Sequence, residues 1–192
     1  MMHRAADSVA NWLVKVNAIG EEEAELYSYA MYSFLITSIP LILSIVVGTF
    51  MNMLLESILF IAPFVIIRKY SGGFHLKSPT VCLIVSTGII AVFLLCIKFV
   101  LKYEFYPVAL ILAILSAILL FIKSPIDSEA RKLSDRETIV FGKIAKSMVV
   151  IFLAVTFILT GFHIYRIAIP ISFGIILPGA LQVPCCFIKH KD

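Results

Sequence analysis

Charged side chains are scarce in this sequence. Asp, Glu, Lys and Arg make up 15% of the 192 residues, whereas apolar residues make up 61%. Soluble domains hold about 25% charged and roughly 45–50% apolar residues. A chain of this length cannot hide so much apolar surface in a water-soluble core. The composition argues against a soluble enzyme, a nucleic-acid-binding module and a disordered protein, and it favours a polytopic membrane protein.

The cysteines and histidines lack the spacings of a metal site or a disulfide framework. The four cysteines lie in or beside apolar runs, and no CxxC pair occurs among them. The four histidines are scattered, so both halves of a zinc signature are missing. We therefore expect neither a metal nor another cofactor.

The N-terminal 25 residues lack the apolar core and the small-residue cleavage site of a signal peptide. Instead, Val9, Trp12, Leu13 and Val16 follow the spacing of one helical face. With Trp12 on this face, the pattern predicts an amphipathic helix in the membrane interface, within residues 1–25. The alternative is a short helix that packs on the rest of the protein.

Long uncharged runs predict an all-α integral membrane protein with six transmembrane helices in a single domain, 1–192. One span needs about 20 residues. The apolar stretch 26–67 is broken only by Glu56, so it is long enough for two spans with a reversal near Gly48–Asn52. The predicted spans lie near 27–47, 50–67, 79–100, 105–122, 147–164 and 167–188.

The distribution of positive charge predicts the orientation of these spans. Six spans place both termini on one face, and 13 of the 16 Lys and Arg residues lie on that face. The other face holds Lys98, Lys102 and Arg166. Because cytoplasmic loops carry an excess of Lys and Arg, we expect both termini and the segments 68–78 and 123–146 in the cytoplasm.

The segment 68–82 holds the residues with the clearest chemistry. Ser78 and Pro79 are typical of a helix start, as N-cap and first helical residue. This start places Cys82 in the first turn of the third span, where the helix dipole and free N–H groups favour a thiolate. His75 precedes Cys82 by seven residues, and a loop could fold it back as a general base.

Further residues of this segment suit such a site. Gly72 and Gly73 allow sharp or left-handed backbone, and Arg68 and Lys77 make the surroundings of the thiol electropositive, which lowers a thiol pKa. The residues alone leave other interpretations open: a packing cysteine, a solvated histidine and an ordinary Gly-Gly turn. No third catalytic residue is identified, and the candidates for it are Ser86, Asp127 and Glu129.

The string Arg68-x-Tyr70-x-Gly72-Gly73-x-His75, followed by Cys82, resembles the accessory gene regulator B family of bacterial membrane peptidases. The resemblance implies an endopeptidase of the bacterial plasma membrane with a cytoplasmic active site. Such an enzyme removes the C-terminal tail of a quorum-sensing propeptide through an acyl-enzyme thioester and supports its cyclisation to a thiolactone or lactone. It implies Cys82 as nucleophile and His75 as general base, and Arg68 and Gly73 as required positions.

The resemblance also implies partners: a propeptide with an acidic C-terminal tail, the lipid bilayer, and a second copy of the chain in a homodimer. The basic segments 68–78 and 123–146, with Gly72, Lys77 and Ser78 as supporting or substrate-binding residues, could dock the tail. Positive charge on cytoplasmic loops explains these segments without any ligand.

One acidic residue stands inside a predicted span. Intramembrane acids are candidates for functional sites, so Glu56 could contact the substrate or pair with a basic residue of a neighbouring helix; it could also lie at the outer boundary. The alternative function for the chain is a small membrane peptide exporter or an assembly factor without catalysis.

Overall fold

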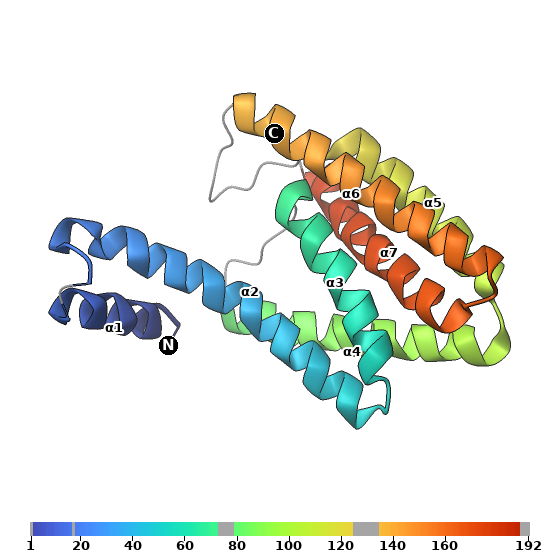
Figure 1. Cartoon of the computed structure of the whole chain (residues 1–192), viewed down its shortest axis with the longest axis horizontal. Coiled ribbons are helices and arrows are strands. Elements are labelled where there is room, and N and C mark those ends of the chain that lie inside the picture. The colour runs from blue at the N-terminus through green and yellow to red at the C-terminus, as the bar shows by residue number, and fades with distance from the viewer. Residues whose placement is uncertain (1, 17, 73–78, 125–134, 189–192) are drawn as a thin grey trace.

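A computed structural model describes residues 2–16, 18–72, 79–124 and 135–188. These residues form helices joined by short turns, with no strand among them, which confirms the predicted all-α class for this part of the chain. The elements are α1 (Met2–Lys15), η1 (Glu21–Glu23), α2 (Ala24–Phe50), α3 (Leu54–Ser71), α4 (Pro79–Tyr103), α5 (Tyr106–Lys123), α6 (Asp135–Gly161) and α7 (Tyr165–Ile188) (Figure 1).

Four helices are long and apolar enough to cross a membrane. Their apolar segments are Ile84–Tyr103, Tyr106–Lys123, Thr138–Gly161 and Tyr165–Val183. Among the described side chains of α2, the apolar segment is Leu41–Phe50, which belongs to a run without any charge from Leu26 to Leu55. α3 carries an acid in its first turn and two basic residues in its last. The last four predicted spans are thus supported by length and composition, and the first two remain predictions.

The turns explain where the helices end. Between α2 and α3 the chain reverses within residues 51–53, close to the predicted position. Asn52 takes a φ of 55° there, a left-handed conformation that asparagine tolerates, and the Met53 N–H donates to the Gly48 carbonyl at 2.7 Å. The largest difference from expectation is α6, which begins at Asp135 and not near 147. A helix can continue past the apolar segment because its polar turns are solvated.

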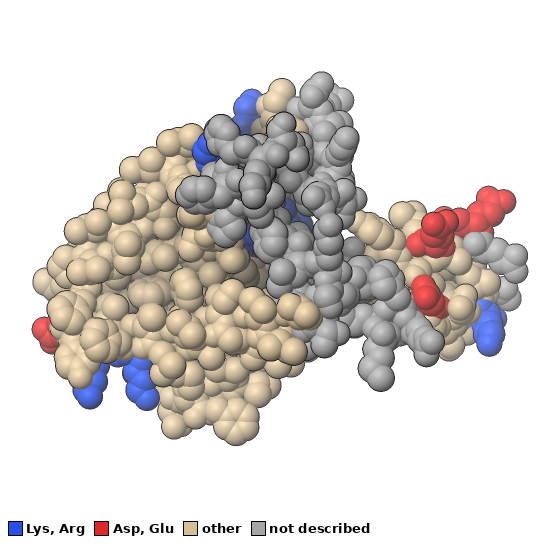
Figure 2. All heavy atoms as spheres, turned by 180° about the vertical axis from the view of Figure 1, so that it is seen from behind, with Lys and Arg blue, Asp and Glu red and all other residues tan. Residues whose placement is uncertain are grey.

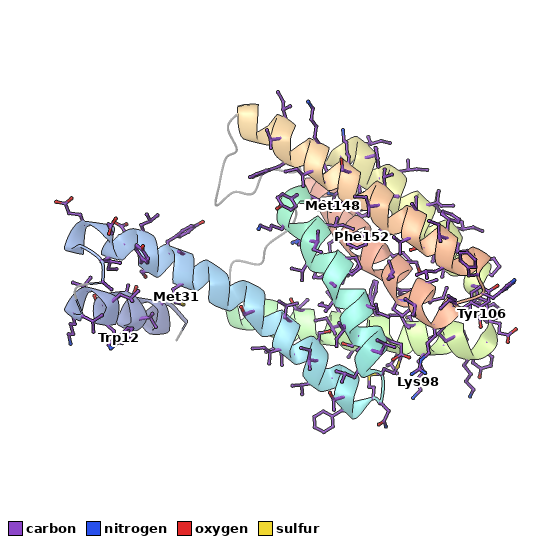
Figure 3. The ribbon with its side chains drawn as sticks, in the orientation of Figure 1. Trp12, Met31, Lys98, Tyr106, Met148 and Phe152 are labelled. Atoms are coloured by element: carbon purple, nitrogen blue, oxygen red, sulfur yellow. The ribbon has the colours of Figure 1, made fainter. Side chains whose placement is uncertain are left out.

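The first half of α2 and α1 form an arm that extends away from the other helices (Figure 1). α1 packs along α2, with Ala6 and Ala10 buried in the contact, and the Ser28 hydroxyl donates to the Asp7 carboxylate at 2.5 Å. α1 therefore packs on the protein, as the alternative reading allowed. Trp12 stays 60% exposed (Figure 3), so the interfacial position of α1 remains a prediction.

The core of the bundle is built around α7. Every residue from 168 to 179 is buried, because α3, α5 and α6 all pack against this helix and α4 runs across it. Phe93 of α4 stacks on Phe60 of α3 at 5.8 Å and meets Phe173 of α7 edge-on at 5.9 Å. These rings join three helices in one apolar cluster.

Small residues bring the helices close to α7. On α5, Ala109, Ala113 and Ala117 repeat every four residues and are all buried. On α7, a Cβ added at Gly174 would lie 2.6 Å from Pro63 Cγ and 2.7 Å from the Phe60 carbonyl oxygen. Small residues drive helix association in membranes, where apolar burial between helices gives little net gain. Gly174 is thus required by the close approach of α3 to α7.

Gly174→Ala should therefore destabilise the bundle by about 1–3 kcal/mol, since the new methyl group meets backbone and a rigid proline ring. The measurement is the thermal unfolding midpoint of the purified chain in detergent. Gly88→Ala is the matched control, because no atom lies within 4 Å of a Cβ built there, and alanine favours a helix over glycine. A Gly174→Ala midpoint equal to that of the control would contradict the close approach.

Candidate functional site

The end of α3 supplies the first two candidate residues, and their local geometry is well defined. Arg68 lies in the last turn of α3, and its Nη1 donates to the Gly72 carbonyl oxygen at 3.2 Å. Gly72 ends the helix with φ 68° and ψ −157°, a conformation that is essentially restricted to glycine. The predicted left-handed backbone is therefore present at Gly72, and the guanidinium of Arg68 is held beside it.

The start of α4 carries the proposed nucleophile. α4 is helical from Pro79, the first described residue after Gly72. With Pro79 as the first helical residue, which the sequence predicts, the backbone of Cys82 lies in the first turn. The side chain of Cys82 lies outside the described part of the chain, as do Gly73, His75, Lys77 and Ser78. The contact between His75 and Cys82 therefore remains a prediction from the sequence, as do the third-residue candidates Asp127 and Glu129, which also lie outside the described residues.

The first turns of α6 pack beside the end of α3. Tyr70 meets Phe141 edge-on, with ring centroids 5.9 Å apart, and the Lys69 ammonium lies 5.4 Å from the Tyr70 ring centroid. Phe141 belongs to the charged segment 123–146, which the sequence predicts as a loop. The helical half of that segment thus lies against the helix that carries Arg68. The predicted span near 147–164 does not include this contact, because it leaves out the polar turns with which α6 begins.

A buried amide near the same end was also missed. Gln182 of α7 is fully buried, and its Nε2 donates to the Ser124 hydroxyl at the end of α5 at 2.8 Å. Its Oε1 has no partner among the described residues. Gly174 packs against Phe60 and Pro63, and α3 and α7 run in the same direction. A step of eight residues along each helix therefore leads from this contact to Gln182 on α7 and to residues 68–71 on α3, which lie at the same level. The sequence signal for this buried residue is a polar amide, Gln182, within a predicted apolar span.

Glu56 lies at the opposite end of α3. Its carboxylate is only 6% exposed and accepts a hydrogen bond from Arg166 Nε of α7 at 2.6 Å. Twelve residues separate Glu56 from Arg68, which is roughly 18 Å along the helix axis. The carboxylate thus pairs with a neighbouring helix, as one of the alternatives stated, and it lies away from Arg68 and Gly72. The structure gives the carboxylate an internal partner, and a contact with the substrate stays a prediction.

Metal-binding groups are not assembled in the described part of the chain. No set of three or more His, Cys, Asp or Glu side chains lies close enough there to hold an ion. Glu56 is occupied by Arg166, and the Nδ1 atom of His163 lies 2.9 Å from the Tyr165 hydroxyl.

The ion pair predicts unequal effects of its two substitutions. Arg166→Met leaves the buried carboxylate without its partner and should cost about 1–2 kcal/mol, a value reduced by the 71% exposure of the Arg166 side chain. Glu56→Gln removes the buried charge and should cost less. The double variant should recover part of the loss, measured by thermal unfolding in detergent. Losses that simply add would show that the two side chains do not interact.

Comparison with known proteins agrees with the sequence motif. The model of the family described as accessory gene regulator B matches residues 6–184. Two Clostridium perfringens proteins named as AgrB-like, from strain SM101 / Type A and strain 13 / Type A, are each 36% identical over 85 residues. The match covers 44% of this chain and only 38% of each relative. No solved structure matches. Because the family model covers nearly the whole chain, the chain belongs to the accessory gene regulator B family.

Proposed function

We propose that this chain is an integral membrane cysteine endopeptidase that matures a quorum-sensing peptide. It cleaves the C-terminal tail from a propeptide and supports cyclisation of the remaining part to a thiolactone or lactone. Cys82 is the nucleophile and His75 the general base. Arg68, Gly72, Gly73, Lys77 and Ser78 are supporting or substrate-binding residues.

One observation carries this proposal. The motif from Arg68 to Cys82 lies within the region that matches the accessory gene regulator B family, and α4 begins at Pro79 so that Cys82 falls in its first turn. Unsatisfied backbone N–H groups, to which Pro79 adds none, and the positive end of the helix dipole lie at such a position. Both favour the thiolate form of a cysteine over the thiol.

The first chemical step is transfer of an acyl group to the enzyme. The Cys82 thiolate attacks the carbonyl carbon of the scissile peptide bond, and backbone N–H groups at the start of α4 stabilise the oxyanion. The C–N bond then breaks, and the protonated His75 gives its proton to the leaving amine of the tail. The N-terminal part of the propeptide remains as a thioester on Cys82.

The second step closes the ring. A thiol or hydroxyl within the bound peptide loses its proton to His75 and attacks the thioester carbon, which returns Cys82 to the thiolate. Water at the same carbon would instead give a linear acid. A site at the membrane boundary limits the access of water, and the bound peptide presents its own nucleophile at high effective concentration.

The membrane arrangement belongs to the same proposal. The family and the four apolar helices support a multi-pass protein of the cell membrane. The bias of Lys and Arg supports a cytoplasmic location for both termini and for the site. A propeptide with an acidic tail would meet the basic residues near the end of α3 and the start of α6, and a homodimer is the proposed assembly.

Substitution of the two catalytic residues tests the proposal. The purified chain is reconstituted in liposomes with a propeptide encoded beside its gene, and mass spectrometry follows release of the tail. We expect Cys82→Ala to abolish cleavage and His75→Ala to slow it by about 10²–10⁴-fold. Cys96→Ala is the matched control and should cleave normally, because Cys96 lies in the apolar part of α4.

The same assay separates the alternative function. An exporter or assembly factor would bind the propeptide without releasing its tail, and Cys82→Ala would leave that binding unchanged. Cleavage that persists in Cys82→Ala would contradict the assigned nucleophile.

The rate of thiol alkylation gives an independent prediction. A lowered pKa means that Cys82 is already a thiolate near neutral pH, whereas an ordinary thiol requires a pH above about 8.5. Alkylation of Cys82 should therefore be faster than that of Cys96 at pH 7 and should reach its plateau at lower pH. Peptide mapping after brief treatment with iodoacetamide measures both sites in one sample. Equal rates and equal pH profiles would contradict an activated Cys82.

A further inference from the structure

The junction of α4 and α5 combines two exposed lysines with a cluster of exposed aromatic rings. Lys98 and Lys102 are both exposed and are four residues apart on α4. Residues at this spacing are neighbours on a helix surface, about 5–6 Å apart at Cβ. Lys98 and Tyr106 lie at the end of the molecule away from the arm (Figure 3).

No carboxylate neutralises these lysines in the described part of the chain. Arg166 of α7, the third basic residue at this end of the bundle, is paired with Glu56. Glu104 follows Lys102 in the turn, with a φ of 59°, and no ion pair joins it to either lysine among the described residues. Two like charges four residues apart repel each other, so this arrangement favours an external anion. Figure 2 shows basic side chains close together at the lower left, with acidic atoms at the neighbouring left edge of an otherwise largely uncharged surface.

Three aromatic rings form a cluster beside the lysines. Phe99 lies 4.5 Å from Tyr103 and 5.9 Å from Phe105, measured between ring centroids. All three rings are about half exposed, and the Lys102 ammonium lies 5.4 Å from the Tyr103 centroid. Phe99 and Tyr103 have the same four-residue spacing as the lysines, so the two pairs form adjacent stripes on α4.

The position along the chain places this surface at a bilayer boundary. The apolar segment Ile84–Tyr103 ends within the cluster, and the next one, Tyr106–Lys123, starts directly after it. Aromatic side chains favour the level between acyl tails and headgroups, and lysine side chains extend their ammonium groups toward the same level. Phosphate groups of lipids lie at that depth.

We propose that Lys98 and Lys102, with Phe99, Tyr103 and Phe105, form a binding surface for an anionic phospholipid. The two ammonium groups hold the headgroup phosphate, and the rings contact the upper part of the acyl chains. Because the rings need an apolar partner, the surface is assigned to a lipid and not to free phosphate. This inference is independent of the peptidase function, since the surface lies at the end of α4 opposite Cys82.

Photo-crosslinking in nanodiscs tests the surface with the full chain. Phosphatidylglycerol and phosphatidylcholine probes carry a diazirine near the headgroup, and peptide mapping quantifies adducts within residues 98–106. Each lysine near an anionic surface adds about fivefold in affinity, so we expect phosphatidylglycerol to be preferred by up to about 25-fold. Lys98→Gln/Lys102→Gln should abolish the preference, and Lys98→Arg/Lys102→Arg should retain it.

Matched controls decide the interpretation. Lys143→Gln/Lys146→Gln removes two lysines of α6 and should leave the preference at residues 98–106 unchanged. Excess inorganic phosphate should not compete with the probe. Circular dichroism and gel filtration confirm that each variant is folded. The proposal is overturned by equal labelling with both lipids, by a preference that survives in the Gln pair, or by competition from inorganic phosphate.

Discussion

The buried carboxylate of Glu56 constrains how the helices of this protein can pack. It lies in the first turn of α3 with 6% of its side chain exposed, and it is paired with Arg166 in the first turn of α7. A charge in such surroundings is costly without a partner. The pair therefore fixes the start of α3 beside the start of α7, and the contact of Gly174 with Phe60 and Pro63 continues the same parallel alignment along both helices.

This alignment determines what meets at the other end of the bundle. The end of α3, with Arg68 and Gly72, lies level with Gln182 of α7, and Gln182 is bonded to Ser124 at the end of α5. The first turns of α6 pack on the same end through Tyr70 and Phe141. Rigid apolar packing in the middle of the bundle thus supports a polar end from which the α3–α4 connection leads to Cys82.

Much of this fold follows from the sequence, because long apolar runs leave few alternatives to helices. The reversal near Asn52 is a local signal that is confirmed. α4 is helical from Pro79, the first described residue after Gly72, as its local signal predicts. The helical stretch from Asp135 has a local signal that the predicted span near 147–164 does not use, since Ser134 and Glu137 have the spacing of a capping box. The packing of α1 on α2 depends on tertiary contacts that no local pattern contains. The pairing of Arg166 with Glu56 could be predicted from the sequence, because both residues are charged and lie at the same predicted membrane boundary. For the site, the residue types and the helix start could be predicted from the sequence. The approach of His75 to Cys82 remains a prediction.

The most direct test of this account is the mass of the enzyme during turnover. The purified chain is mixed with its propeptide, quenched in acid within seconds, and measured as an intact protein. We predict an added mass equal to the propeptide without its tail, located on the peptide that contains Cys82 and removed by hydroxylamine, as expected of a thioester. Release of the tail with no such adduct at any time, or an adduct on another residue, would contradict nucleophilic catalysis by Cys82.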